Sequence, residues 1–203
     1  ANHNDVAGIL HEGGTILRSS RSKRFFDYEY RKQAYKNLVS NDINKLIVLG
    51  GDGSFRALQQ FYHDFGVEFV GIPATIDNDI FGTDYCLGVD TALNMIRNAT
   101  DAIRDTSSSF KRACVVETMG RECGYLALIS ALTCGAEICI IPELEYNLNS
   151  LGIKLKEEII NGRNYIVCVV AEGTNQTQRL VEWLECDIGI ETRATILGHV
   201  QRG

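Results

Sequence analysis

Two carboxylates and a hydroxyl follow a short apolar run in residues 71–80, which read GIPATIDNDI. In an extended backbone successive side chains alternate in direction, so Thr75, Asp77 and Asp79 would project to one side. Two acids this close raise each other's pKa, because like charges disfavour the ionised form. One of them is therefore suited to act as a general base. An acidic turn explains this stretch at least as well when it is taken alone, since Pro, Asn and Asp are common turn residues.

A second stretch combines glycines with an acid. Residues 50–54 read GGDGS, directly after the apolar residues 46–49 and before a predicted helix over residues 55–61. A glycine turn between a strand and a helix binds phosphate through free backbone N–H groups and the helix dipole. The Asp52 carboxylate would repel a phosphate unless Mg²⁺ lies between them, and Mg²⁺ commonly binds carboxylates together with phosphate oxygens. Helix capping by Asp52 is an equally good explanation at this point.

Cationic side chains gather near glycines although the chain is net acidic. The formal net charge is -6, which argues against a general nucleic-acid binder. Arg193, His199 and Arg202 nevertheless cluster near the end of the sequence, with Arg112 and Arg121 elsewhere. Arginine is well suited to binding phosphate and carboxylate groups in a bidentate way. The sequence therefore indicates a small anionic, phosphorylated ligand.

Alternating strands and helices must position these residues. The predicted strands are residues 46–49, 69–72, 113–117, 137–141 and 165–170, and the predicted helices are residues 26–39, 55–61, 90–104, 125–134 and 151–161. The threonine and serines of residues 106–109 are expected to end the fourth helix. Such alternation is typical of an α/β fold with a mostly parallel sheet, in which ligands bind at the carboxyl ends of the strands.

Composition limits the class of protein. The 203 residues are 45% hydrophobic and 23% charged, as in ordinary globular proteins. No apolar run approaches membrane-spanning length and no secretory leader is recognised, so we expect no membrane partner. The net charge of -6 likewise leads us to expect no nucleic-acid partner. Seven cysteines, an odd number with no Cys-x-x-Cys pair, indicate reduced thiols, a cytoplasmic location and no zinc site.

Several motifs, in order along nearly the whole chain, resemble those of the phosphofructokinase family. They are residues 50–54, 73–80, 119–124 and 192–203, with residues 13–21 and 104–109 fitting the same family. The resemblance implies an α/β protein of two Rossmann-like, three-layer domains with mostly parallel sheets, incomplete at both ends. An ATP-binding domain is expected over residues 1–88, without its N-terminal strand and loop. A fructose 6-phosphate-binding domain is expected over residues 89–203, returning to the first domain near residues 200–203.

The resemblance also implies an activity, the transfer of phosphate from Mg-ATP to O1 of fructose 6-phosphate, the committed step of glycolysis. It implies that Asp77 is the base, that Thr75 and Arg121 steady the transferring phosphoryl group, that Asp79 holds the acidic loop and that Asp52 is linked to Mg²⁺. The implied nucleotide-binding residues are Arg21, Ser22, Gly51, Asp52, Gly53 and Ser54. The implied substrate-binding residues are Thr75, Ile76, Asp77, Arg112, Met119, Gly120, Arg121, Glu172, Arg193, His199, Val200, Gln201 and Arg202.

By the same resemblance the protein is an allosteric homotetramer in which Arg112 and Arg193 complete the site of a neighbouring subunit. Arg104 and Glu137 match positions of an effector site and Arg163 is a plausible equivalent. Asn161 stands where a lysine is expected, which puts effector control in doubt.

Other functions remain as alternatives. Pyrophosphate-dependent relatives tend to carry Asp in place of Gly53 and Lys in place of Ala74, so this chain favours ATP as the donor. A catalytically silent regulatory homologue would have lost Asp52, Asp77 or Arg121, and all three are present. An NAD or lipid kinase would lack the arginines and histidine of residues 193–202. A generic nucleotide-binding module would not bind fructose 6-phosphate.

Overall fold

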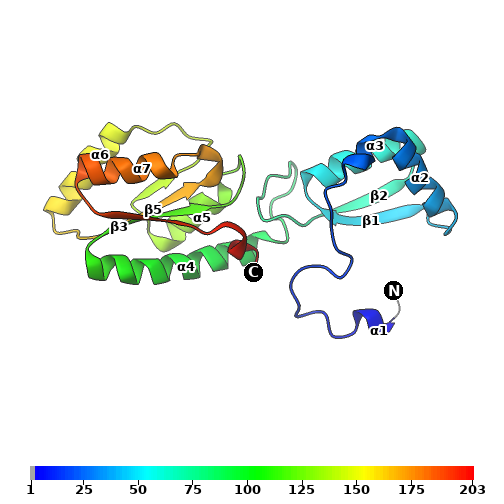
Figure 1. Cartoon of the computed structure of the whole chain (residues 1–203), viewed down its shortest axis with the longest axis horizontal. Helices are drawn as coiled ribbons and strands as arrows, with labels where there is room; N and C mark the ends of the chain where they lie inside the picture. The colour runs from blue at the N-terminus through cyan, green and yellow to red at the C-terminus, as the bar shows by residue number, and fades with distance from the viewer. Residues whose placement is uncertain (1–2) are drawn as a thin grey trace. The chain divides into compact units, whose positions relative to one another are not determined.

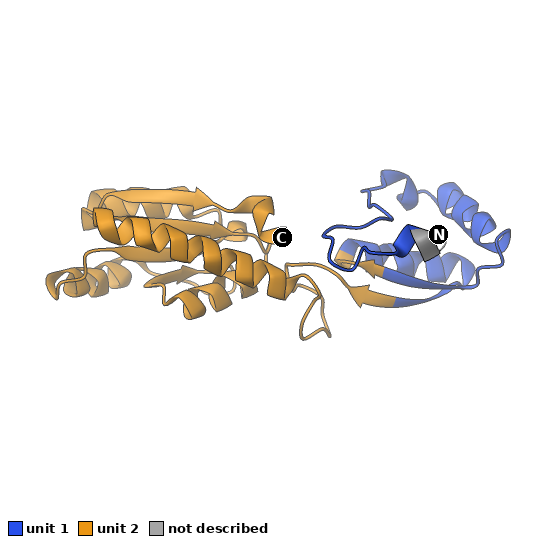
Figure 2. Ribbon diagram, turned by 90° about the horizontal axis from the view of Figure 1, so that it is seen from below, with its two compact units in different colours: residues 1–48, 53–70 blue, residues 49–52, 71–203 orange. Residues whose placement is uncertain are grey.

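The computed structural model describes residues 3–203 and their arrangement into two compact units, which are treated separately here (Figures 1 and 2). Unit 1 comprises residues 1–48 and 53–70, and unit 2 comprises residues 49–52 and 71–203. Two strands, β1 (Lys45–Gly50) and β2 (Glu68–Pro73), pair in a two-stranded sheet, and each continues from unit 1 into unit 2 at its carboxyl end.

Aromatic side chains and one buried arginine hold the helices of unit 1 together. Its helical elements are α1 (His3–Val6), the 3-10 turn η1 (Lys23–Phe26), α2 (Tyr28–Val39) and most of α3 (Asp52–Phe65). Tyr35 of α2 stacks on Phe65 of α3 at 4.9 Å between ring centroids. Arg31 of α2 donates from Nε to Asp64 at 2.5 Å, while its Nη1 donates to the carbonyl oxygens of Phe25 and Phe26.

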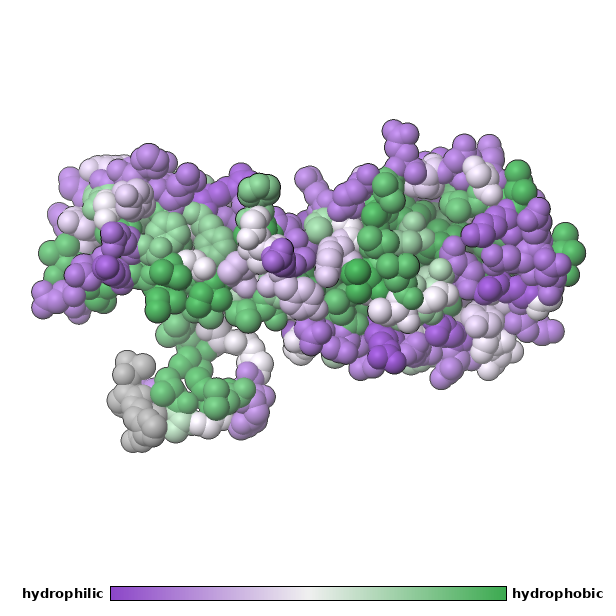
Figure 3. Space-filling model, turned by 180° about the vertical axis from the view of Figure 1, so that it is seen from behind, coloured by the Kyte–Doolittle hydropathy of each residue, from purple (hydrophilic) through white to green (hydrophobic). Residues whose placement is uncertain are grey.

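The two-stranded sheet leaves apolar side chains exposed. Residues of β1 alternate between exposed and half-buried, with Ile47 and Leu49 exposed, and Val70 of β2 is exposed as well. Figure 3 shows apolar side chains on the surface of unit 1. A sheet of only two strands is marginally stable by itself and needs other elements packed against it.

Unit 2 contains a four-stranded parallel sheet between two layers of helices (Figure 1). The strand order is β4-β5-β3-β6, and the three strand pairs are parallel. The strands are β3 (Ala113–Thr118), β4 (Ile138–Ile140), β5 (Ile166–Ala171) and β6 (Thr192–Ile196). The helices are α4 (Val89–Phe110), α5 (Tyr125–Cys134), α6 (Leu148–Ile160) and α7 (Thr177–Trp183), with short turns η2 (Glu172–Thr174), η3 (Leu184–Ile188) and η4 (Gly198–Arg202).

Alternation along the strands separates the two cores of unit 2. Val115 of β3 packs with Leu155 of α6 and Leu180 of α7 on one face of the sheet. Val116, the next residue, packs with Ile96 of α4 and Leu126 of α5 on the other face. Strands with apolar residues on both faces are typical of a parallel sheet covered by helices on both sides. The predicted α/β class with a parallel sheet is therefore confirmed.

Two local predictions differ from the structure. Helix α4 continues through residues 106–109 to Phe110, because the hydroxyls there turn back onto the helix instead of breaking it. Ser108 and Ser109 both donate to the carbonyl oxygen of Asp105, the bonding that lets serine remain inside a helix. The helix ends at Phe110, and Lys111, which follows it, has a φ of 55°. The second difference is α7, for which no helix was predicted.

Within residues 3–203, none of the helices combines the length and apolar character that spanning a bilayer requires. Six of the seven cysteines are buried or half-buried and Cys186 is exposed, and all of them are free.

Helix α6 offers a matched test of the packing. Leu155 is 3% exposed in the core, whereas Ile153, two residues earlier, is 65% exposed. We expect Leu155→Ala to lower the free energy of unfolding by about 2–5 kcal/mol, because it removes buried methyl groups and leaves a cavity. Ile153→Ala should change it by less than about 0.5 kcal/mol. Urea denaturation of the full-length protein measures both, and equal losses would contradict the assigned burial.

Candidate active site

An ion pair joins the loops that follow β2 and β3. Nε of Arg121 lies 3.3 Å from Oδ2 of Asp77. Asp77 is only 6% exposed, whereas the Arg121 side chain is 60% exposed. The carboxylate is thus enclosed by protein, while the guanidinium keeps a surface that a ligand can reach. The structure thus brings together Asp77, the predicted base, and Arg121, which is predicted to steady the phosphoryl group.

The surroundings of Asp77 raise its pKa above the ordinary aspartate value. Burial is the largest cause, because it disfavours the charged carboxylate, and the negative charges of Asp79 and Glu172 act in the same direction. The positive charge of Arg121 and a hydrogen bond with Thr75 act against the rise. A carboxylate whose pKa is raised holds a proton more readily, which suits a general base.

The acidic loop is a turn and not an extended strand. Strand β2 ends at Pro73, the chain bends at residues 76–77, and Asn78 has a φ of 57°. The amide of Asp77 donates to Oγ1 of Thr75 at 3.2 Å, and Oδ1 of Asn78 accepts from the amide of Cys86 at 3.0 Å. The prediction that an extended backbone aligns Thr75, Asp77 and Asp79 is therefore wrong. A turn stabilised by side-chain hydrogen bonds positions the carboxylate instead.

Side chains from two other strand ends fix the loop of residues 119–124. The amide of Met119 donates to Oε1 of Gln201 at 3.2 Å, and the amide of Arg121 donates to Oε1 of Glu172 at 3.0 Å. Gln201 is fully buried in η4, and Glu172 begins η2 directly after β5. Residues predicted to bind substrate thus also shape the backbone that carries Arg121.

A third side chain anchors the end of this loop. The amide of Gly124 donates to Oε1 of Glu143 at 2.7 Å. Gly124 precedes the first residue of α5, so the Glu143 carboxylate satisfies a free N–H group at a helix N-terminus and lies where the helix dipole favours negative charge. Glu143 was not among the predicted site residues. Its only signal in the sequence is an acid just after a predicted strand and Pro142.

Two glycines allow the loop to pass close to its neighbours. Gly120 has a φ of 139°, a conformation that side chains with a Cβ rarely adopt. A Cβ on Gly173 would collide with the carbonyl oxygen of Arg121. The backbone of η2 therefore packs directly against the residue that pairs with Asp77.

The glycine turn that is predicted to bind a nucleotide belongs to unit 2 in its first residues, 50–52. A Cβ on Gly51 would lie 3.7 Å from Cβ of Thr75, and the amide of Ala74 donates to the carbonyl oxygen of Gly50 at 2.9 Å. These contacts place the glycine turn beside the start of the acidic loop. Arg21, Ser22, Gly53 and Ser54 belong to unit 1, and their binding to a nucleotide stays a prediction.

Asp52 is the first residue of α3, where a carboxylate is favoured by the helix dipole. Within residues 3–203 there is no group of three or more His, Cys, Asp or Glu side chains that could hold a metal by themselves. Mg²⁺ commonly uses one or two carboxylates and completes its shell with phosphate oxygens and water. A single carboxylate at a helix start that follows a glycine turn fits this mode of binding.

The predicted phosphate-binding residues divide between the two ends of the sheet. His199, Val200 and Arg202 are exposed in η4, which follows β6 and also carries Gln201. Arg112 precedes the first residue of β3, and Arg193 pairs with Cys114 at the beginning of the same strand. A strand of six residues spans roughly 20 Å, so these two arginines lie far from Asp77 and Arg121 of their own chain.

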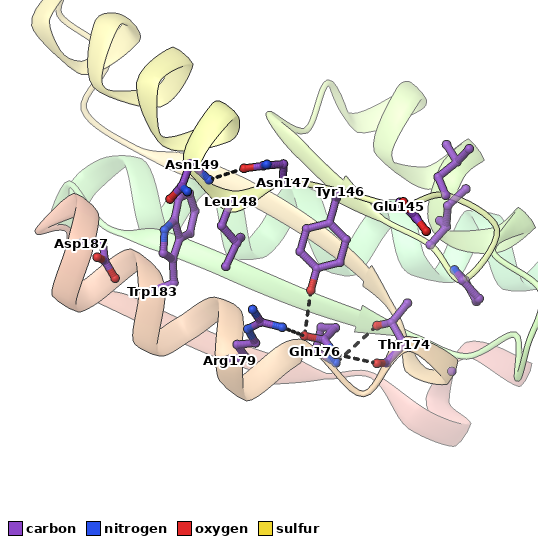
Figure 4. A pocket seen from close by; sticks show the side chains of 14 residues that line it. Glu145, Tyr146, Asn147, Leu148, Asn149, Thr174, Gln176, Arg179, Trp183 and Asp187 are labelled. Carbon is purple, nitrogen blue, oxygen red and sulfur yellow. Dashed lines mark hydrogen bonds between the residues drawn. The ribbon is translucent and has the colours of Figure 1, made fainter.

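A cavity of about 810 Å³ lies between the β4–α6 connection and α7, and none of the predicted site residues lines it (Figure 4). Several of its polar side chains are hydrogen-bonded to one another. Tyr146 donates to Oε1 of Gln176 at 2.7 Å, Arg179 donates to the same oxygen at 3.3 Å, and Gln176 donates to the carbonyl oxygen of Thr174 at 3.2 Å. Asp77 and Arg121 therefore remain the candidate site.

Comparisons with known proteins identify the family of this chain. The family model described as Phosphofructokinase matches residues 1–203. An ATP-dependent 6-phosphofructokinase of Sulfurimonas denitrificans is 62% identical over 100% of this chain and 64% of its own length. One of Wolinella succinogenes is 60% identical over 98% of this chain and 63% of its own length. A solved phosphofructokinase from Saccharomyces cerevisiae superposes with a TM-score of 0.93 at 36% identity, covering 100% of this chain and 32% of the solved chain. The chain thus spans less than two thirds of the length of the curated relatives it matches.

Gly173 permits a direct test of how the loop is held. We expect Gly173→Ala to push the backbone of Arg121 away and to break its hydrogen bond with Glu172, because the added Cβ has no space. Hydrogen–deuterium exchange of residues 119–124 should then become about tenfold faster or more, since protected amides exchange through local opening. Gly13→Ala is the control, because its Cβ would meet no atom within 4 Å. Unchanged exchange in Gly173→Ala would show that the contact is unimportant.

Proposed function

The chain belongs to the phosphofructokinase family, and from this premise we propose that the whole protein phosphorylates fructose 6-phosphate at O1 with Mg-ATP, as a step of glycolysis. The observation that carries the proposal is a buried carboxylate, Asp77, with a raised pKa and a partly exposed arginine at 3.3 Å. A base beside a cation is what the transfer of a phosphoryl group to an alcohol requires from side chains.

In this reaction Asp77 orients the O1 hydroxyl of the sugar and takes its proton. Burial favours that transfer, because a carboxylate in a low-dielectric site is the stronger base. Arg121 faces the negative charge that spreads over the transferring phosphoryl oxygens, and Thr75 steadies the same group while bonding the amide of Asp77. Asp79 contributes negative charge that keeps the pKa of Asp77 high.

The nucleotide is assigned to the glycine turn and the start of α3. Gly51, Gly53 and Ser54 would leave room for the phosphates and offer backbone N–H groups, with Arg21 and Ser22 as further contacts. Asp52 would hold Mg²⁺, which when bound neutralises phosphate charge. Gly53 favours ATP over pyrophosphate as donor, because it leaves open the space that the Asp of pyrophosphate-dependent relatives would fill. No atom lies within 4 Å of the position that a Cβ would take. Separate assays with the two donors test this choice.

The sugar phosphate is assigned to residues at the carboxyl ends of β3, β5 and β6. Met119, Gly120 and Glu172 would contact the sugar, with Ile76 nearby in the acidic loop. Of the two carboxylate oxygens of Glu172, only Oε1 accepts a hydrogen bond within residues 3–203, so Oε2 is available to a sugar hydroxyl. His199 and Arg202 of η4, with the adjoining Val200 and Gln201, would bind the 6-phosphate.

Arg112 and Arg193 are assigned to the 6-phosphate of a neighbouring subunit in a homotetramer. Their place at the amino ends of β3 and β6 supports this assignment, because they lie at the opposite end of the sheet from Arg121. The site of each chain is then complete only in the assembly. We further assign residues 1–88 to the ATP-binding domain, residues 89–203 to the sugar-phosphate domain, and the protein to the cytoplasm.

The positions that match an effector site are already paired within the chain. Arg163 pairs with Glu137 and also with Glu158, and Arg104 donates to the carbonyl oxygen of Cys134. An anionic effector at these positions would therefore compete with carboxylates that are already bound. With Asn161 in place of a lysine, we propose that such an effector binds weakly.

Replacing the base tests the central assignment. We expect Asp77→Ser in the full-length protein to lower kcat by about 10²–10⁴, because the serine cannot accept the proton as a carboxylate does. The KM for fructose 6-phosphate should change by less than about threefold. Asp84→Ser, which changes an exposed acid of the same connection, is the control. Turnover that is unchanged in Asp77→Ser would remove Asp77 from the role of base.

The raised pKa of Asp77 predicts the acid side of the pH–rate profile. Activity should fall as pH falls through this pKa, at a pH above the ordinary aspartate value of 3.8, because only the ionised carboxylate accepts a proton. In Arg121→Gln the remaining activity should decline at a still higher pH, because the cation that lowers the pKa is gone. A decline at lower pH in the variant would contradict the assignment.

A further inference from the structure

One carboxylate bridges the two arginines at the amino end of the sheet. Oε2 of Glu191 accepts from Nε of Arg112 at 2.8 Å, and Oε1 accepts from Nη2 of Arg193 at 2.6 Å. The carbonyl oxygen of Glu191 also accepts from the amide of Ala113 at 2.8 Å. Glu191 is therefore tied by its backbone to the start of β3 and by its side chain to both cations.

The remaining contacts of the arginines leave donors for an anion. The guanidinium of Arg112 lies over the ring of Phe110, at 4.7 Å from the ring centroid, and within residues 3–203 its terminal nitrogens have no hydrogen-bond acceptor. Nη1 of Arg193 donates to the carbonyl oxygen of Thr192 at 3.1 Å. The ring and the carboxylate fix the plane of Arg112, and its outer edge remains available. A guanidinium edge binds phosphate oxygens in a bidentate way.

The charges at this point do not cancel. Two guanidiniums share the single carboxylate of Glu191, and Lys111 adjoins them in the sequence. The cluster of Arg112, Glu191 and Arg193 has a net charge of +1. Lys111 offsets the nearby carboxylate of Glu185, which accepts from the first amide of β6 at 3.3 Å. The cluster therefore attracts an anion, while the carboxylate of Glu191 offsets the repulsion between the two guanidiniums.

We propose that Glu191 is a positioning residue, which holds Arg112 and Arg193 together in the orientation that binds the phosphate group presented by a second copy of this chain. The proposal rests on the function proposed above. Free arginine side chains lose conformational freedom when they are fixed. Because Glu191 fixes the pair before the ligand arrives, less of this loss falls on binding. The opposite role is also testable, since a carboxylate that merely competed with the phosphate would weaken binding.

The test is Glu191→Gln in the full-length protein, assayed with fructose 6-phosphate and ATP. We expect the KM for fructose 6-phosphate to rise about tenfold and kcat to change less than about twofold, because the phosphate it affects does not react. The KM for ATP should not change. Glu145→Gln, an exposed glutamate with no ion pair within residues 3–203, is the matched control. A lower KM in Glu191→Gln, or a KM equal to that of the control, would overturn the proposal.

A second comparison separates positioning from a merely structural role. In a protein that already carries Arg112→Ala and Arg193→Ala, Glu191→Gln should raise the KM no further, because it acts only through these side chains. A further rise in that background would contradict the proposal. Glu191→Asp should restore part of the affinity lost in Glu191→Gln, since it keeps the charge.

The outcomes also distinguish this inference from the proposed function. If the unsubstituted protein fails to phosphorylate fructose 6-phosphate, the proposed function is wrong and this inference falls with it. If the unsubstituted protein is active and Glu191→Gln behaves like the control, only the inference is wrong.

Discussion

The contact between Arg121 and Asp77 is the interaction on which the rest of the site depends. A carboxylate buried as deeply as Asp77 would be costly without a cation nearby, and a fully matched cation would remove its basicity. Asp77 lies between these limits. Its pKa is raised, because burial and the charges of two further acids outweigh the effect of a single partly exposed guanidinium. The loops after β2 and β3 must therefore meet with side-chain accuracy.

That accuracy comes from side chains outside the two loops. The amides at the beginning, middle and end of residues 119–124 are held by Gln201, Glu172 and Glu143, which follow β6, β5 and β4. Every strand of the four-stranded sheet thus contributes to the position of one loop. A parallel sheet makes this possible, because all of its strands deliver their next residues to the same end.

The sequence predicted the framework better than the anchors. Apolar runs located the strands, and polar residues at their ends pointed to Asp77, Arg121 and Glu172. The helix over residues 106–109 was missed, because serine hydroxyls satisfied by carbonyl oxygens cannot be recognised from composition. Glu143 was missed because its partner, Gly124, lies 19 residues away in the sequence, and Glu191 because its bond to Arg112 spans 79 residues. Only the folded chain shows which distant group a surface acid meets.

Strand β3 has a consequence of its own. Its six residues carry Arg112 just before one end and the loop of Arg121 just after the other, with a solid core along the whole length. If each chain lends Arg112 and Arg193 to a neighbour, as proposed above, β3 would connect residues of two active sites. A substitution that disturbs the packing of β3, for example at Val115, would then affect the active site of the chain that bears it and that of the adjoining subunit.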